Sequence, residues 1–123
     1  MYIGIDLGGT NIAVGLVDES YKVVAKGSRP TGATRHYTEI IKDMAELCQE
    51  LMDENGLTIS DIQGIGIGSP GTTDTQKGEI IYANNLDWYN VPPCSFDCIN
   101  SFNPSKRGCW RSYSRFRYIR NRW

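Results

Sequence analysis

The sequence lacks an apolar run of the roughly 20 residues that a membrane-spanning helix needs, so we expect no span of the bilayer. It has one histidine, His36, which lies in a polar stretch and is therefore expected to be a solvated surface residue rather than a catalytic base. Its four cysteines lack the spacing and the nearby histidine of a zinc site: Cys48, Cys94, Cys98 and Cys109. We expect reduced thiols and no bound metal at these positions.

The length and composition bound the architecture. A chain of 123 residues fits one ordinary domain and leaves no room for two lobes that close around a small substrate. A hydrophobic fraction of 40% and a charged fraction of 22% suit a globular protein. The first residues, Met1 to Asp6, contain no basic leader, which predicts a cytoplasmic protein.

The charge is distributed unevenly along the chain. Residues 1–92 hold six basic and thirteen acidic residues, a net charge of −7. Residues 93–123, called the basic tail below, hold seven basic residues and one acidic residue, a net charge of +6. Such a break is typical of a domain boundary, of a tail with its own partner, or of a sequence not selected to fold with the rest.

The pattern of residues 1–92 predicts an α/β fold in the order strand, strand, strand, helix, strand, with one further strand after it. Apolar runs and alternation predict strands at residues 2–7, 12–17, 23–26, 62–67 and 79–83. Three-to-four spacing of apolar residues predicts a helix from about residue 37 to 54, which Asn55-Gly56 ends. Opening strands joined by short turns argue against a Rossmann start, where a helix follows the first strand.

The segment from Asp6 to Asn11 carries most of the chemical information. Paired glycines, Gly8 and Gly9, let backbone N–H groups approach a polyphosphate, and Thr10 and Asn11 add side-chain donors. Asp6, at a strand end, is placed to hold Mg²⁺ or its water. No Gly-Lys-Ser/Thr follows, so this is not a Walker loop. On these residues alone, an ordinary hairpin turn with an acid at its mouth is the alternative.

Three segments in order resemble motifs of the ROK family of bacterial glucokinase-like sugar kinases. Residues 3–11, Ile-Gly-Ile-Asp-Leu-Gly-Gly-Thr-Asn, resemble its first phosphate loop, and Asp18 matches a second acid that follows. Residues 65–71 resemble its glycine-rich strand end and Pro-Gly turn beside the sugar. Residues 84–92 resemble its Asn-Leu-x-Trp segment leading into Val-Pro. The resemblance implies the actin-like, ribonuclease-H-like fold, with only part of the first lobe in residues 1–92.

The resemblance also implies ATP and Mg²⁺ as cofactors and a hexose as substrate. It places the nucleotide at Asp6, Gly8, Gly9, Thr10 and Asn11. It places the sugar at Gly68, Gly71, Asn84 and Asn85. For these four residues the structural alternatives stay open, because glycine lets a strand turn and asparagine is common in turns. Trp88 is expected to pack rather than to stack on a ligand.

One expected part of the machinery is missing. The family's general base is the Asp of an Asn-Asp-x-Asn motif just past the Val-Pro segment, and no Asn-Asp pair occurs in this sequence. Phosphoryl transfer needs both positioned reactants and acceptance of the hydroxyl proton. We therefore assign no catalytic residue and expect the chain to be an inactive kinase fragment when alone.

The basic tail follows none of the family pattern. Its arginines and aromatic residues suit a nucleic-acid-binding arm, but a change of reading frame after Pro92 is the favoured interpretation, because the pattern stops within a motif.

A sugar-sensing regulator is the other non-enzymatic alternative. ROK repressors carry a helix-turn-helix before the phosphate loop, and Asp6 follows too soon after Met1 for one, which favours the kinase. Uncovered apolar faces predict self-association.

Overall fold

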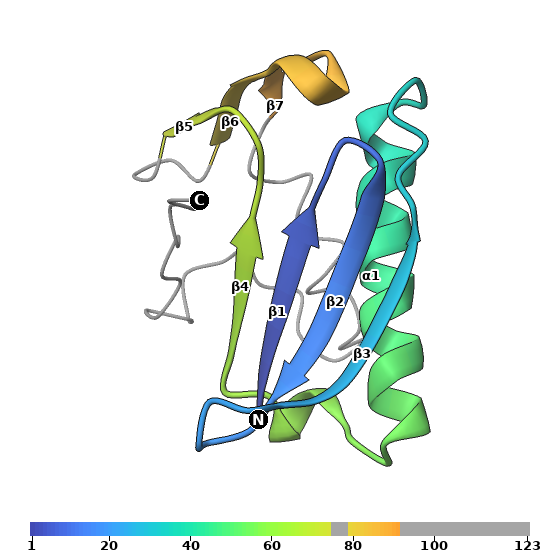
Figure 1. Ribbon diagram of the computed structural model, residues 1–123, viewed down its shortest axis with the longest axis vertical. Coiled ribbons are helices and arrows are strands. Elements are labelled where there is room, and N and C mark those ends of the chain that lie inside the picture. Colours follow the sequence, from blue (N-terminus) through green and yellow to red (C-terminus); the bar gives the residue numbers. More distant parts are fainter. Residues whose placement is uncertain (75–78, 92–123) are drawn as a thin grey trace.

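The computed structural model describes residues 1–74 and 79–91 (Figure 1). A four-stranded sheet is built from β1 (Tyr2–Leu7), β2 (Asn11–Val17), β3 (Val23–Pro30) and β4 (Gly64–Gly68). The strand order is β3-β2-β1-β4, with β1 antiparallel to β2 and parallel to β4. The basic tail, with Cys94, Cys98 and Cys109, lies outside the described residues.

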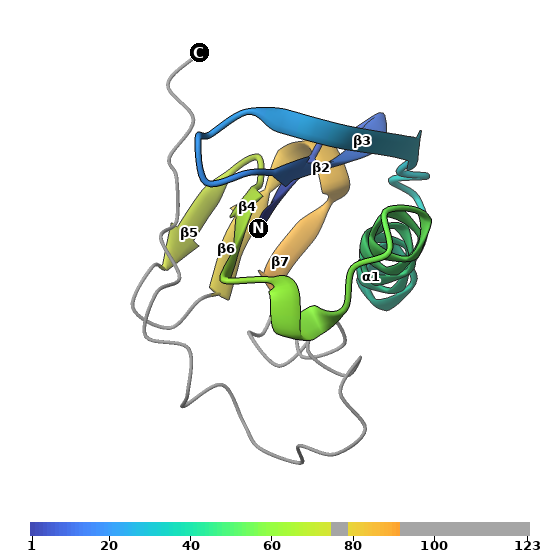
Figure 2. The same cartoon turned by 90° about the horizontal axis from the view of Figure 1, so that it is seen from below.

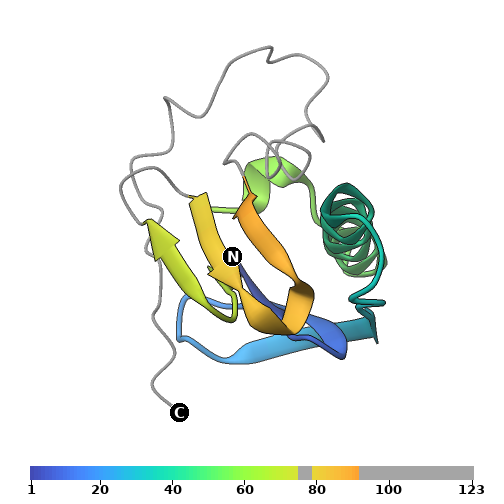
Figure 3. The same cartoon turned by 90° about the horizontal axis from the view of Figure 1, so that it is seen from above.

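One face of this sheet is buried because apolar residues alternate along β1 and β2. The helix α1 (Tyr37–Glu54) supplies the matching apolar stripe. Figures 2 and 3, which look along the strands, show α1 and the strands β5 to β7 on the same side of β2 and β3. The fully buried side chains of this core include Ile3, Leu7, Ile12, Leu16, Ile40, Ile41, Met44, Met52, Leu86 and Val91.

No helix or strand among the described residues covers the opposite face of the sheet, which carries small residues (Figure 2). The registers place Gly4 of β1 beside Gly15 of β2 and beside Gly66 of β4. A Cβ added at Gly4 or Gly66 would meet no atom within 4 Å. An alanine at either position is therefore accommodated without any shift of the chain.

The helix α1 has the bounds that its periodicity predicts. At its start His36 is exposed, and its Nδ1 accepts a hydrogen bond from the Thr38 backbone N–H. His36 is thus a surface residue, as expected, and caps the helix. At its end Gly56 has φ +65°, a left-handed conformation that glycine adopts without a Cβ clash.

Two strand predictions need correction. The third strand runs to Pro30 rather than to residue 26, because its register with β2 extends the pairing where its own hydrophobic pattern is weak. The fourth strand begins at Gly64 rather than at residue 62. A 3₁₀ turn, η1 (Ile59–Asp61), takes up the preceding residues, and the carboxylate of Asp61 caps it through Thr58.

A second, three-stranded sheet lies beyond the ends of β1 and β4 (Figure 1). It consists of β5 (Thr72–Asp74), β6 (Glu79–Ala83) and β7 (Trp88–Val91), in the order β5-β6-β7. Only β6 is predicted from the sequence. A 3₁₀ turn, η2 (Asn84–Leu86), joins β6 to β7. Trp88 is 4% exposed and packs in the core, as expected.

No helix in the described ranges is long and apolar enough to span a membrane.

Candidate functional site

The turn between β1 and β2, residues 8–11, is a tight four-residue turn. The Gly8 N–H donates a hydrogen bond to the Asn11 carbonyl at 2.9 Å. A Cβ on Gly8 would lie 2.8 Å from the same carbonyl oxygen. Because real Cβ atoms do not approach backbone that closely, this turn requires glycine at its first position. We call residues 8–11 the phosphate turn, after the ligand that the sequence predicts for them.

The phosphate turn leaves donors unused at its tip. Within the described residues, the backbone N–H groups of Gly9 and Thr10 donate no hydrogen bond. Thr10 and Asn11 are exposed, and so is Asp6 at the end of β1. Free amides in a turn attract anions, and a free carboxylate beside them attracts a hard cation. The nucleotide residues predicted from the sequence therefore share one exposed edge of the sheet.

Parallel pairing brings β4 to the same edge. The register places Gly68, at the end of β4, directly beside Asp6 of β1. The two strands run in the same direction, so their carboxyl ends meet there (Figure 1). Gly68, a predicted sugar residue, is in this way adjacent to the predicted nucleotide site.

The segment η2 lies against the phosphate turn although it is far from it in the sequence. A Cβ on Gly9 would lie 3.1 Å from the Asn85 Cβ and 3.3 Å from the Asn85 carbonyl oxygen. Asn84 and Asn85 are exposed, and the Asn84 Oδ1 accepts a hydrogen bond from the Tyr82 hydroxyl at 2.9 Å. The amide side chains predicted to bind sugar thus stand next to the turn predicted to bind phosphate.

Gly71 has a different setting. Its φ is +93°, and a Cβ there would lie 2.0 Å from the Tyr82 carbonyl oxygen and 2.7 Å from the Ala83 Cα. The backbone of Gly71 therefore lies directly against β6. This contact gives Gly71 a structural reason to be glycine, whatever its role toward a ligand.

An open cavity of about 720 Å³ adjoins η2. One wall is the β3–α1 connection, residues 33–37, and the other is residues 84–89 with Val91. Tyr37 and Trp88 meet edge to face across it, with ring centroids 6.2 Å apart. Asn84 and Asn85 line this cavity, whereas Gly68 and Gly71 are not among its lining residues.

Asp18, which follows β2, lies at the other end of the sheet from the phosphate turn. Its Oδ1 accepts hydrogen bonds from the Ser20 hydroxyl at 2.6 Å, the Ser20 N–H at 2.8 Å and the Lys22 N–H at 3.0 Å. Chiefly the Ser20 hydroxyl bond, together with the Lys22 N–H, lowers the pKa of Asp18. This acid therefore closes the β2–β3 turn.

Sequence reasoning missed Thr31. Among the described residues it is the one polar residue that is buried with the core. Its hydroxyl donates to the Gly8 carbonyl at 2.7 Å, and its N–H donates to the Thr10 carbonyl at 2.8 Å. Thr31 thus supports the phosphate turn from behind. No local pattern signals this contact, because Gly8 lies 23 residues earlier in the chain.

The α/β fold of the described residues matches part of one lobe of actin-like sugar kinases. The structure matches a ROK family glucokinase from Streptomyces griseus, solved in complex with glucose and AMPPNP, with a TM-score of 0.66 and 27% sequence identity. The match covers 78% of this chain and 29% of that one. The sequence profile of the ROK family matches residues 2–96, and the chain belongs to the ROK family.

Curated relatives include kinases of more than one sugar. A glucokinase of Thermotoga maritima is 38% identical over 91 residues, which cover 73% of this chain and 27% of that protein. An N-acetyl-D-glucosamine kinase of Salmonella newport is 34% identical over 84 residues, covering 68% of this chain and 26% of that protein. The chain therefore spans little more than a quarter of the length of these relatives.

Proposed function

We propose that this chain is the N-terminal portion of an ATP-dependent hexose kinase, which transfers a phosphoryl group from ATP to a sugar hydroxyl. The observation that carries the proposal is the meeting of the phosphate turn with Asn85 of η2. It brings a candidate anion site and candidate hydroxyl-binding amides side by side. The kinase names of the relatives support it, and so does the AMPPNP and glucose complex of the Streptomyces griseus enzyme.

The residues of the phosphate turn fit a nucleotide with Mg²⁺. The amides of Gly9 and Thr10 are unused, the Asn11 side chain is exposed, and the Asp6 carboxylate has no partner among the described residues. Bound Mg²⁺ would neutralise charge on the phosphates during transfer. Asp6 would hold the ion or its water, and the turn would orient the phosphate oxygens by backbone donation.

The hexose is proposed to bind near Asn84 and Asn85, at the edge where Gly68 adjoins Asp6. An amide offers both a donor and an acceptor, which matches the needs of a sugar hydroxyl. Gly68 and Gly71 allow backbone to lie close to neighbouring groups. A cytoplasmic location is part of the proposal, in keeping with the free thiol of Cys48.

The chain alone is proposed to be catalytically inactive. Its sequence has no Asn-Asp pair, so it lacks the carboxylate that the ROK resemblance assigns as general base. In a coupled ADP-release assay with glucose, mannose and N-acetylmannosamine, turnover should stay at background. Sugar-dependent ADP release that Asp6→Ala abolishes would contradict this part of the proposal.

Nucleotide binding is tested by titrating the full chain with Mg-AMPPNP in a calorimeter. Asp6→Asn should weaken binding by roughly tenfold, because it removes one charge-assisted contact. Gly9→Ala should also weaken binding, because its Cβ would press on Asn85 at 3.1 Å. Gly4→Ala is the matched control, since its Cβ meets nothing within 4 Å. Equal affinities for all four proteins would overturn the assignment of this site.

A further inference from the structure

Thr31 uses all of its polar groups within the structure. Its side chain is fully buried, its hydroxyl donates to the Gly8 carbonyl at 2.7 Å, and its N–H donates to the Thr10 carbonyl at 2.8 Å. Its own carbonyl accepts a hydrogen bond from Arg35 Nη2 at 2.7 Å. One residue directly after β3 therefore holds two carbonyls of the phosphate turn.

Holding these carbonyls orients the amides of the turn. The Gly8 carbonyl and the Gly9 N–H belong to the same peptide group, and no described peptide bond is cis. In a trans peptide the C=O and the N–H point in opposite directions. Because the Gly8 carbonyl faces Thr31, the Gly9 N–H faces away from it. A rotated peptide would instead present a carbonyl oxygen, which repels phosphate.

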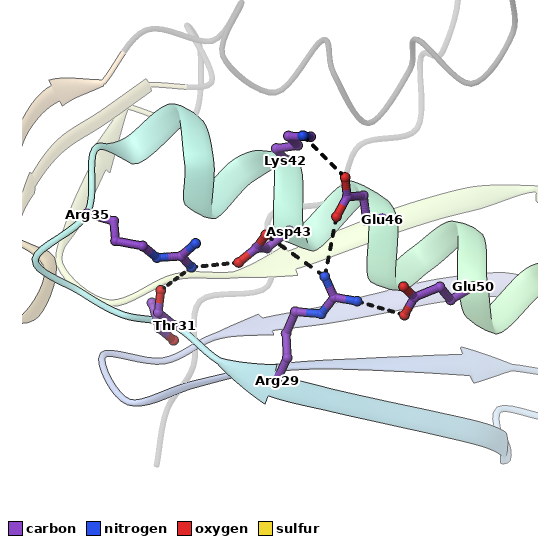
Figure 4. A network of polar contacts seen from close by, with 7 residues as sticks. All are labelled: Arg29, Thr31, Arg35, Lys42, Asp43, Glu46 and Glu50. Atoms are coloured by element: carbon purple, nitrogen blue, oxygen red, sulfur yellow. Dashed lines mark hydrogen bonds and ion pairs between the residues drawn. The ribbon is translucent and has the colours of Figure 1, made fainter.

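Arg35 connects this support to the helix α1 (Figure 4). Its Nη2 donates both to the Thr31 carbonyl and to Asp43 Oδ2 at 2.6 Å. Gly32 permits this path, since its φ is +60° and a Cβ there would lie 2.6 Å from Arg35 Nε. Asp43 of α1 also lies 3.9 Å from Arg29 of β3, so the helix and the strand share this network.

We propose that Thr31 is the positioning residue that keeps the phosphate turn ready for a polyphosphate, and that Arg35 fixes Thr31 to α1. The inference rests on the proposed nucleotide site. The hydroxyl is the part that matters, because valine would fill the same space and leave the half-buried Gly8 carbonyl without its donor. Serine would keep the donor and lose one methyl group.

Amide hydrogen exchange of the full chain, read by NMR, tests the proposal without any ligand. Two protected amides report on the turn: Gly8, bonded to the Asn11 carbonyl, and residue 31, bonded to the Thr10 carbonyl. Thr31→Val should accelerate exchange at both by roughly tenfold or more. The amide of Met44 in α1 should keep its rate. Thr31→Ser should restore rates to within about threefold of wild type.

Arg35→Gln is the second variant, and it leaves the Thr31 hydroxyl in place. It should accelerate exchange at residue 31 more than at Gly8, because it releases the Thr31 backbone from α1. Equal acceleration at Met44 and Gly8 in Thr31→Val would show a merely structural role and overturn the proposal. So would a Thr31→Ser chain that exchanges as fast as Thr31→Val, or unchanged rates at Gly8.

A Mg-AMPPNP titration of the same variants separates this inference from the proposed function. Thr31→Val should bind roughly tenfold more weakly than Thr31→Ser. Absence of binding by the wild-type chain would count against the nucleotide site itself, while the exchange pattern would still establish or refute the positioning role of Thr31.

Discussion

Three glycines allow the cost of backbone crowding to be separated from the cost of backbone strain. Gly71 has φ +93°, and its Cβ would lie 2.0 Å from the Tyr82 carbonyl oxygen. Gly56 has φ +65° with nothing within 4 Å of a Cβ. Gly4 has no positive φ and no neighbour within 4 Å. Alanine at Gly71 therefore imposes both costs, alanine at Gly56 imposes the strain alone, and alanine at Gly4 imposes neither.

The expected changes in the free energy of unfolding follow from the backbone conformation and the surroundings of each glycine. Gly4→Ala should be neutral or stabilise by about 0.5 kcal/mol, because alanine restricts the unfolded chain. Gly56→Ala should destabilise by about 1 kcal/mol, the cost of a left-handed alanine. Gly71→Ala should cost about 2–4 kcal/mol, since β6 must also move away from the new methyl group. That is a large part of the stability of a small domain.

Circular dichroism melts of the three variants, at one low protein concentration, measure the differences. For a domain of this size, about 1 kcal/mol shifts Tm by roughly 4–8 °C. Gly71→Ala should therefore melt about 10–30 °C below wild type, and Gly56→Ala only about 4–8 °C below it. A Gly71→Ala chain as stable as Gly56→Ala would refute the close approach of Gly71 to β6.

The remaining predictions concern chemistry, association and the gene. Burial raises the pKa of the Cys48 thiol to about 12, so iodoacetamide at pH 8 should alkylate Cys48 only in urea, as peptide mapping would show. Because the unfolded thiol ionises near 9.0, this group should destabilise the fold only as pH rises from there toward 12. Exposed apolar side chains, with Tyr21 83%, Val23 62% and Tyr89 63% exposed, predict oligomers in sedimentation velocity, and a monodisperse monomer would contradict this. Translation of the gene from codon 93 in another reading frame should reveal an Asn-Asp-x-Asn motif. A chain expressed in that frame should show hexose kinase activity. If neither frame contains the motif, a salt-dependent nucleic-acid titration becomes the relevant test.

Much of the fold follows from local patterns. The bounds Tyr2–Leu7 and Tyr37–Glu54 are those predicted, because burial on one face imposes a period of two on a strand and of 3.6 on a helix. The short strands Thr72–Asp74 and Trp88–Val91 escape prediction. Each is too brief to show a period, and pairing with β6 rather than intrinsic preference makes it a strand.

The candidate site, like the fold, is only partly predictable from the sequence. The sequence by itself determined which groups the phosphate turn offers to a ligand, since the paired glycines, the neighbouring acid and the polar side chains are adjacent in the chain. Only the tertiary structure decided that Asn85 lies on Gly9, that Gly71 lies on β6 and that Thr31 bonds to Gly8. These contacts join residues distant along the chain. They depend on sheet register and on the crossover through α1, which no local sequence pattern encodes.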